Sequence, residues 1–557
     1  MDRSVSWWDC GEFITTSYTL GVGHPPGAPF YQLVAHCVML LSFGNPLLVA
    51  PLSNALSAIC GGFTVGLLYW TLCEFHSGAP STSYRLGAAV GALCYLFCDT
   101  AWFSAVESEV YAMAMLLCSL CVWATARWMR TSNARLLLLA ALALGLGVCV
   151  HLMVLLVAPA MLLMLVAGKV HWRQVALMVP FFLLGLSPYA VVPIRAAANP
   201  PVNEGNPASA EAFVSYVRRD QYAKAPLYPR MWRERDSANH DYWSLGFDGV
   251  AGNAVYYVNY QLGYMYGRYL MYNFIGRENL KHRCVALFII PMLLAVAGLF
   301  AMRRRRRQAY RVVMLLFLFG GPLLNLYLNH PCYEPRERDY AYVLSFYAVA
   351  MWVGAGAAWS FDRMCNAPAL QRRRVLQWGA AALVWLAPLS MVLGNWSDHD
   401  RHRCHSVHDI AMAHLQSCDN DAILITFGDN DTFPLWYLQH VERQRTDISV
   451  HNVNLEGFAA IRRLLAANAG RRPVYVSQYF YDRFGDSYEG LLRCEGFCWR
   501  LLPDGVGVDD TGPLGRHVAD SIEWHITPGE YTDPVSASFL AVWEANVASV
   551  AEQRREH

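Results

Sequence analysis

Long apolar runs separated by short polar connectors occupy residues 1–395. A helix needs about 20 apolar residues to cross a bilayer, and ten of these runs reach or approach that length. The pattern therefore predicts an all-α polytopic membrane protein built as a helical bundle. The ten runs lie near 52–74, 86–100, 108–127, 136–149, 152–167, 174–194, 284–302, 310–328, 341–361 and 375–394.

The pattern changes after residue 395, where polar residues return and the apolar runs shorten to strand length. Strands that alternate with helices are typical of a parallel α/β sheet. We therefore predict a membrane domain at 1–395 and a soluble C-terminal α/β domain at 396–557. The expected strands are 422–426, 448–450 and 474–476, and the expected helices are 433–442 and 456–467.

Charge and composition narrow the class of protein to which this chain can belong. Hydrophobic residues make up 55% of the chain and charged residues 16%, whereas soluble domains carry about 25% charge. These values exclude a disordered chain and an ordinary water-soluble enzyme. The net charge of +1 leaves no basic field for nucleic acid, so no nucleic-acid partner is expected.

The distribution of Lys and Arg predicts the orientation. Basic residues favour cytoplasmic loops, and the densest run is Arg303–Arg307. If 52–74 crosses inward, the acidic and aromatic loops and the C-terminal domain all face outward. We interpret a further apolar stretch, 28–43, as a helix lying in the membrane interface, because counting it as a span would move Asp9 and Glu12 away from the other acidic loops.

The first polar cluster is Trp7-Trp8-Asp9-Cys10-Gly11-Glu12. Asp9 and Glu12 are three residues apart, so both face one side of a helical turn. A carboxylate near apolar surroundings suits a general base. A capping box, with Asp9 at the N-cap and Glu12 at the third position, explains the same spacing equally well.

Three further segments supply candidate binding residues. His24 begins a stiff proline-rich turn, and its role is either substrate contact or structure. Glu107 and Glu109 lie at the end of a membrane helix, where a carboxylate usually has a partner or a function. Asp429 and Asp431 follow the first predicted strand, where ligands often bind, although capping of the next helix is the simpler role.

The loop 329–340 is dense in charge. The forked donors of Arg336 and Arg338 suit a phosphate group, and Tyr333 is a further binding candidate. The alternative is an ion-pair network of the two arginines with Glu334, Glu337 and Asp339. Aromatic residues of the long loop 195–283 suit either sugar or peptide recognition or a membrane-interface belt.

Six ordered motifs spread over roughly residues 5–460 carry a family resemblance. The chain resembles a GT-C type membrane glycosyltransferase family that includes animal transmembrane protein 260, a protein O-mannosyltransferase, and it is similar to the bacterial branch. The family has a membrane helix before its first motif, and we expect the present sequence to lack it. The motifs are WWDCGEF, GVGHPPGAPF, WFSAVESEVYAM, PIRAAANPPVNEGNP, YEPRERDYAYV and GDNDTFPLWYLQ.

The resemblance implies a glycosyltransferase of the bacterial cytoplasmic membrane whose active face and C-terminal domain are extracytoplasmic. Its donor is a polyprenyl-phosphate sugar, with mannose expected, and its acceptor is a Ser or Thr hydroxyl of an exported protein. Asp9 is then the base, Glu12 orients it or the acceptor, and Arg336, Arg338 and Arg195 stabilise the departing phosphate. No cofactor is required; a Glu/His pair is able to bind a divalent metal, but we predict no metal site.

Two other functions fit a polytopic chain. A transporter would place charges near the bilayer midplane, whereas the predicted spans are nearly free of charge. A non-catalytic membrane anchor for the α/β domain would tolerate loss of Asp9 and Glu107 together.

Overall fold

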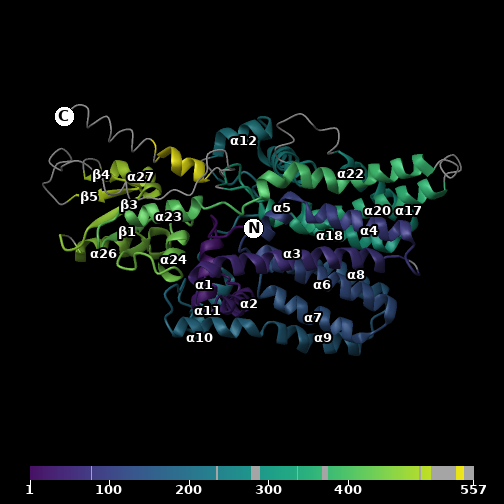
Figure 1. Ribbon diagram of the computed structural model, residues 1–557, viewed down its shortest axis with the longest axis horizontal. Coiled ribbons are helices and arrows are strands. Elements are labelled where there is room, and N and C mark those ends of the chain that lie inside the picture. Colours follow the sequence, from purple (N-terminus) through teal and green to yellow (C-terminus); the bar gives the residue numbers. More distant parts are fainter. Residues whose placement is uncertain are drawn as a thin grey trace.

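The computed structural model of the chain has two parts that lie along its long axis, a helical bundle and a smaller region with a five-stranded sheet (Figure 1). Apolar helices and a predominantly helical fold confirm the predicted class. The structure describes residues 1–76, 78–233, 236–276, 289–334, 336–366, 374–468, 470–488, 491–502, 535–542 and 544.

The helices of the bundle follow the predicted runs closely, and further helices form in its outer connections. They are α1 (Cys10–Thr19), α2 (Pro29–Met39), α3 (Val49–Glu74), α4 (Thr82–Leu96), α5 (Asp99–Val106), α6 (Val110–Thr131), α7 (Ala134–Val148), α8 (Ala158–Ala167), α9 (Trp172–Gly185), α10 (Val191–Ala197), α11 (Ala210–Arg218), α12 (Ser237–Ser244), α13 (Gly249–Tyr256), α14 (Arg268–Ile275), α17 (Ile290–Arg305), α18 (Arg307–Gly320), α19 (Pro322–Leu328), α20 (Val343–Asn366) and α22 (Arg374–His399).

The chain is a multi-pass membrane protein. Within the described residues, five helical segments are long and apolar enough to cross a bilayer, and the number is six if α4 and α5, which meet at a bend of 62°, form one broken span. The other predicted runs coincide with shorter helices or with α17 and α22, and residues 284–288 lie outside the described part. The five segments are Pro46–Glu74, Val110–Thr131, Trp172–Ala197, Arg307–Leu328 and Asp339–Asn366.

Small residues let the central helices approach closely. α20 is almost wholly buried and packs along α4 and α17. A Cβ added at Gly91 of α4 would lie 2.6 Å from the carbonyl oxygen of Ala350 in α20, so only glycine allows this approach. Close backbone contact of this kind stabilises helix pairs where no hydrophobic effect drives them together.

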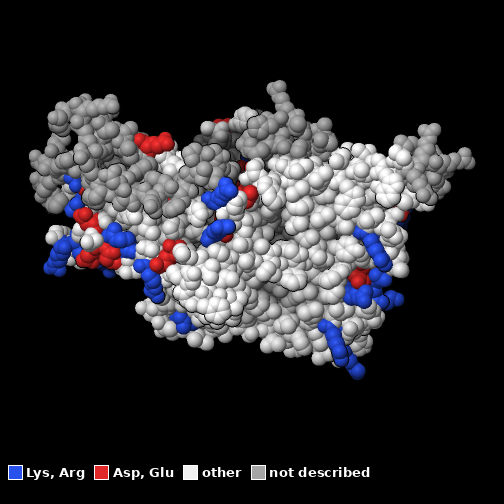
Figure 2. All heavy atoms as spheres, viewed as in Figure 1, with Lys and Arg blue, Asp and Glu red and all other residues white. Residues whose placement is uncertain are grey.

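Charge is absent from much of the bundle surface. Figure 2 shows a wide uncharged face on the helical part, with Lys and Arg gathered at the end of the bundle away from the sheet. Arg130 and Arg306 lie together near the C-terminal ends of α3 and α6, since Arg130 donates to Glu74 and Arg306 donates to the carbonyl oxygen of Phe75. An uncharged belt bounded by basic side chains on one side is the surface expected of a protein embedded in a bilayer.

The segment 195–283, predicted as one long loop, is mostly helical where it is described. It holds α10 to α14 and a π-helix, Tyr257–Gly267. Tyr256, Tyr260 and Tyr269 are buried there, with hydroxyl or ring contacts to neighbouring elements. These three aromatic side chains therefore pack inside the protein, so they do not form an exposed belt at the membrane interface.

The C-terminal part has the strand order β2-β1-β3-β5-β4. β1 pairs in parallel with β2 and β3, which confirms the predicted parallel core, whereas β4 and β5 form an antiparallel hairpin that the sequence did not predict. The strands are β1 (Ile423–Thr426), β2 (Ser449–Asn452), β3 (Val474–Ser477), β4 (Leu492–Glu495) and β5 (Cys498–Leu501). The helices are α23 (Ser406–Gln416), α24 (Phe433–His440), α25 (Val453–Glu456), α26 (Phe458–Asn468) and α27 (Gln478–Phe484).

The two parts meet through α1 and α24, which pack against each other (Figure 1). A Cβ added at Gly11 would lie 2.6 Å from the carbonyl oxygen of Phe433, so the absence of a side chain at Gly11 permits this contact. A parallel bridge between Val22 and Asn203 brings the segment after α10 to the same region. Loops distant in sequence therefore converge along α1, with Phe433 against Gly11 near its N-terminal end and Asn203 beside Val22 just after its C-terminal end.

Candidate active site

Asp9 stands at the N-cap of α1 but does not cap it. Its side chain accepts a hydrogen bond of 3.0 Å from Nη2 of Arg336, 327 residues away. The backbone N–H of the preceding Trp8 donates to Oδ1 of Asn430. The capping-box interpretation of Asp9 is therefore wrong, and its carboxylate is available to the space between these loops.

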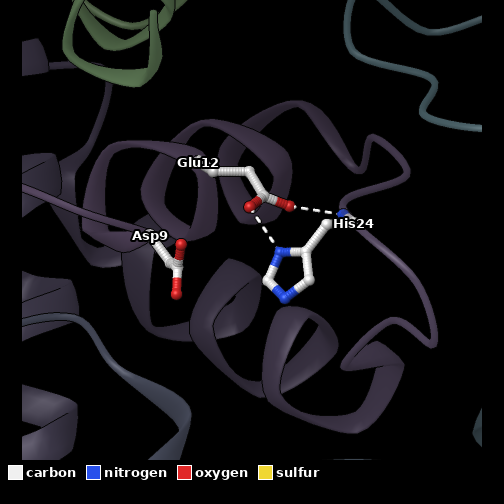
Figure 3. A group of neighbouring side chains, drawn as sticks. All are labelled: Asp9, Glu12 and His24. Carbon is white, nitrogen blue, oxygen red and sulfur yellow. Dashed lines mark hydrogen bonds and ion pairs between the residues drawn. The ribbon is translucent and has the colours of Figure 1, made fainter. Parts of the chain in front are cut away.

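Glu12 and His24 form a pair beside Asp9 (Figure 3). One oxygen of Glu12 accepts from the His24 backbone N–H, and the other lies 2.6 Å from Nδ1 of the ring. Glu12 is completely buried in α1, and His24 is fixed by the turn that precedes α2. Glu12 thus orients His24, whereas we expected it to orient the acceptor or Asp9.

These three groups set one another's charge. Burial lowers the pKa of His24, but the negative charges of Glu12 and Asp9 outweigh it and raise the pKa to about 10. Burial raises the pKa of Asp9, but the positive charges of Arg336 and His24 prevail and hold it below its usual value. At neutral pH the site therefore contains an imidazolium beside an ionised Asp9.

The two arginines of the loop 329–340 have different partners. Arg336 contacts Asp9, donates to the hydroxyl of Tyr340 and lies over the ring of Trp8. Arg338 instead binds Glu334 through two nitrogens. The structure therefore brings Arg336 to the site, while Arg338 forms the ion pair of the alternative interpretation. The side chain of Tyr333 is 60% exposed.

The two acidic residues of the second motif, Glu107 and Glu109, have different partners. Glu107 accepts a hydrogen bond of 3.0 Å from Arg401, which also binds Asp2. Burial raises the pKa of Glu107 to about 7, although the positive charge of Arg401 lowers it. Glu109 lies close to Asp9; burial and that negative charge raise its pKa well above the usual value. Among the described residues, its Oε2 is buried without a hydrogen-bond partner. Glu109 therefore faces the site, and Glu107 ties the bundle to the C-terminal part.

Arg195 lies elsewhere. Its Nε and Nη2 donate to the carbonyl oxygens of Leu20 and Thr19 at the C-terminal end of α1. A helix of ten residues is about 15 Å long, so the structure does not bring Arg195 together with Arg336. Its predicted role toward phosphate stays a prediction.

Two further residues lie near the site: Glu204, which was not predicted for it, and Asp429, which was a candidate from the predicted α/β domain. Glu204 is 7% exposed, and burial together with the negative charge of Glu12 raises its pKa well above the usual value. The motif PIRAAANPPVNEGNP contained the only sequence signal for it. Asp429 is exposed, yet the surrounding protein and the charges of Asp9 and Glu12 raise its pKa to about 6.

We had expected Asp429 and Asp431 to cap the following helix, but neither side chain does so. The N-cap of α24 is Thr432, without a side-chain cap. Asp431 is buried, and its Oδ2 accepts from the backbone N–H of Phe427 and the hydroxyl of Ser477. Asp431 therefore holds the loop, and Asp429 is the member of the pair that faces the site.

A metal ion is one ligand that this geometry accommodates. Asp9, Glu12 and His24 each offer one ligand atom, and these atoms all lie within 4.8 Å of one another. Two carboxylates and an imidazole suit Mn²⁺ or Zn²⁺. The guanidinium of Arg336 already neutralises Asp9, which disfavours a second cation at that carboxylate. The prediction that no metal is required stays a prediction.

Comparison with known proteins connects the site to a family. Residues 9–174 match the family model of the protein O-mannosyl-transferase TMEM260 N-terminal domain, and residues 407–460 match TMEM260-associated domain 2. The chain is 24% identical over 467 residues to the protein O-mannosyl-transferase TMEM260 of Mus musculus, covering 81% of this chain and 60% of the relative. It is 22% identical over 488 residues to that of Dictyostelium discoideum, covering 81% and 55%.

The fold has a solved counterpart. ArnT from Cupriavidus metallidurans in the apo state superimposes with a TM-score of 0.55 at 13% identity, covering 92% of this chain and 96% of that chain. The family resemblance and the GT-C fold expected from the motifs are thus confirmed. The chain is a membrane protein with the GT-C fold, and its residues 9–174 and 407–460 match the models of the protein O-mannosyl-transferase TMEM260 N-terminal domain and of TMEM260-associated domain 2.

Proposed function

We propose that the chain is a glycosyltransferase that moves a sugar, mannose, from a polyprenyl phosphate to Ser or Thr hydroxyls of exported proteins. The observation that carries the proposal is the contact between Asp9 and Arg336. It joins a carboxylate and a guanidinium from two separate loops at one end of the bundle. The names of the curated relatives support the reaction class, although the chain spans only 60% and 55% of their lengths.

In the proposed reaction Asp9 takes the proton of the acceptor hydroxyl. The hydroxyl oxygen forms a bond to the anomeric carbon while the bond from that carbon to the phosphate oxygen breaks, and the electron pair leaves with the phosphate. Arg336 stabilises the negative charge on that phosphate. This single displacement inverts the anomeric centre, and the low pKa of Asp9 keeps it ready as a carboxylate.

His24 and Glu12 maintain this charge state. The His24 imidazolium, held by Glu12, lowers the pKa of Asp9 and adds a positive charge where the phosphate arrives. Glu109 gives a second buried carboxylate near Asp9. The chain's own residues therefore supply a base, two cations and a leaving-group site.

We place the protein in the bacterial cytoplasmic membrane with this site outward. The basic run Arg303–Arg307 then faces the cytoplasm, in keeping with the usual charge bias. The division into a membrane domain at 1–395 and an extracytoplasmic domain at 396–557 is part of the same proposal.

Transfer of radiolabelled mannose tests the proposal. Membranes that contain the chain are supplied with polyprenyl-phosphate mannose and a Ser/Thr peptide, and polyprenyl-phosphate glucose serves as the second donor. We expect labelled peptide above membranes without the chain, with mannose preferred and the product anomer inverted relative to the donor. Absence of transfer from either donor would contradict the proposed reaction.

A further inference from the structure

The loop that follows β1 reaches from the C-terminal part onto the site. Oδ1 of Asn430 accepts a hydrogen bond of 2.6 Å from the backbone N–H of Trp8, the residue before Asp9. The next helix, α24, packs on α1 through the contact of Phe433 with Gly11. Asp429 is therefore presented at the site by a contact between segments that are 422 residues apart.

The backbone of this loop is held firmly. The backbone N–H groups of Thr432 and Phe433 donate to the carbonyl oxygen of Asp429, and Asn452 donates to that of Gly428. Asn430 and Asp431, the two residues that follow Asp429, are buried, whereas the side chain of Asp429 is exposed. The fold therefore fixes the position of Asp429 through its main chain and leaves its carboxylate at the surface.

Asp429 is the exposed member of an acidic cluster, which we define as Asp9, Glu12, Glu109, Glu204 and Asp429. Glu12, Glu109 and Glu204 are buried, and Asp9 is partly buried. A peptide that approaches from water therefore meets Asp429 first.

At neutral pH the ionised members Asp9, Glu12 and Asp429 outnumber the cations His24 and Arg336, because the raised pKa values of Glu109 and Glu204 favour their neutral forms. His24 and Arg336 are the cations whose charges act on it most directly. Among the described residues, the Oε1 of Glu204 and the Oε2 of Glu109 are buried without hydrogen-bond partners. Glu204 lies close enough to Glu12, His24 and Asp429 for their charges to shift its pKa. This excess favours a cationic group in the ligand and repels an anionic one.

We propose that Asp429 is a specificity-determining residue that selects acceptor peptides with a basic rather than an acidic residue beside the reactive Ser or Thr. The inference rests on the proposed function, because it assigns the acceptor side of the same site. It also gives the C-terminal part a role, since that part supplies a side chain which the bundle lacks.

A pair of peptides tests the inference. The two differ only in a Lys or a Glu next to the Ser/Thr hydroxyl, and their binding to the full chain in detergent is measured by fluorescence anisotropy, with transfer measured in parallel. The wild type is expected to prefer the Lys peptide. Asp429→Asn should reduce the ratio of affinities by about 2- to 5-fold, the range for a partly exposed charge pair, and Asp429→Lys should reduce it further.

Asp421→Asn is the matched control. Asp421 is an exposed aspartate that precedes β1 at the opposite end of the same strand and pairs with Arg472. Its replacement should leave the preference unchanged. An unchanged ratio in Asp429→Asn, or an equal fall in Asp421→Asn, would overturn the inference. Binding that depends on Asp429 without any transfer would contradict the proposed function and leave the specificity assignment standing.

Discussion

Arg336 donates to Asp9 across 3.0 Å, although the two residues stand in the first and the last of the outer loops of the bundle. The guanidinium also lies 4.5 Å from the ring centre of Tyr340 and 4.8 Å from that of Trp8. Both residues therefore lie on one side of the membrane. In the proposed reaction the same arginine holds the base as a carboxylate and receives the leaving phosphate.

Replacement of Arg336 by Lys tests this double role. Lysine keeps the charge but loses the planar fork and the stacking between two rings. We expect the KM for the lipid donor to rise by about 10-fold or more, the effect of losing one charge-assisted hydrogen bond. Arg338→Lys is the control, because Arg338 binds Glu334. Equal effects of the two substitutions would argue against a special position for Arg336.

The charge state of His24 predicts a pH dependence of stability. Folding raises its pKa from 6.5 to about 10, so protonated His24 stabilises the folded state. This contribution is complete below pH 6.5 and is lost as the pH rises through about 10. The difference in Tm between the wild type and His24→Gln should therefore be largest near about pH 6 and shrink toward about pH 10. A difference that stays constant in thermal unfolding would contradict the charged pair with Glu12.

Arg401 is expected to be structural. It is 8% exposed and binds both Asp2 and Glu107, so Arg401→Met leaves two buried carboxyl groups without their cation. The loss of stability should be about 3–5 kcal/mol. The control Arg127→Met removes an exposed partner of Glu74 and should cost about 0–1 kcal/mol. Denaturation in detergent measures the stability of both variants. A small and similar loss of stability for Arg401→Met and Arg127→Met would refute the structural role of Arg401.

Gly11 tests the contact between the two parts of the chain. A Cβ at this position would meet the carbonyl oxygen of Phe433, so Gly11→Ala should cost about 1–3 kcal/mol and lower the rate of transfer by displacing α24. Gly62→Ala in α3 is the control, since nothing lies within 4 Å of its added Cβ. Activity of Gly11→Ala equal to that of Gly62→Ala would show that this contact does not support the site.

The sequence predicted the helical bundle because the length of an apolar run is a local property. It also predicted that Asp9, His24, Glu109 and Arg336 converge, because the orientation of the spans places their loops on one side. The β4–β5 hairpin was missed, since LRCE and CWRL are only four residues each and CWRL shows no apolar alternation.

Other parts of the site depend on tertiary contacts that no local pattern encodes. Glu204 arrives through the bridge of Val22 with Asn203, and Asp429 through the packing of α24 on α1. Whether Asp9 would cap α1 or serve as a base beside Glu12 could not be decided from spacing, because both interpretations use the same two residues three positions apart.

The most direct test of the proposed reaction is the rate of sugar transfer by Asp9→Asn. Asparagine keeps the shape of the side chain and removes its capacity to take a proton. We predict that the kcat for transfer from polyprenyl-phosphate mannose falls by about 100-fold or more, while Asp421→Asn keeps the wild-type rate. A kcat for Asp9→Asn equal to that of the wild type would contradict Asp9 as the base and the reaction centre built on it.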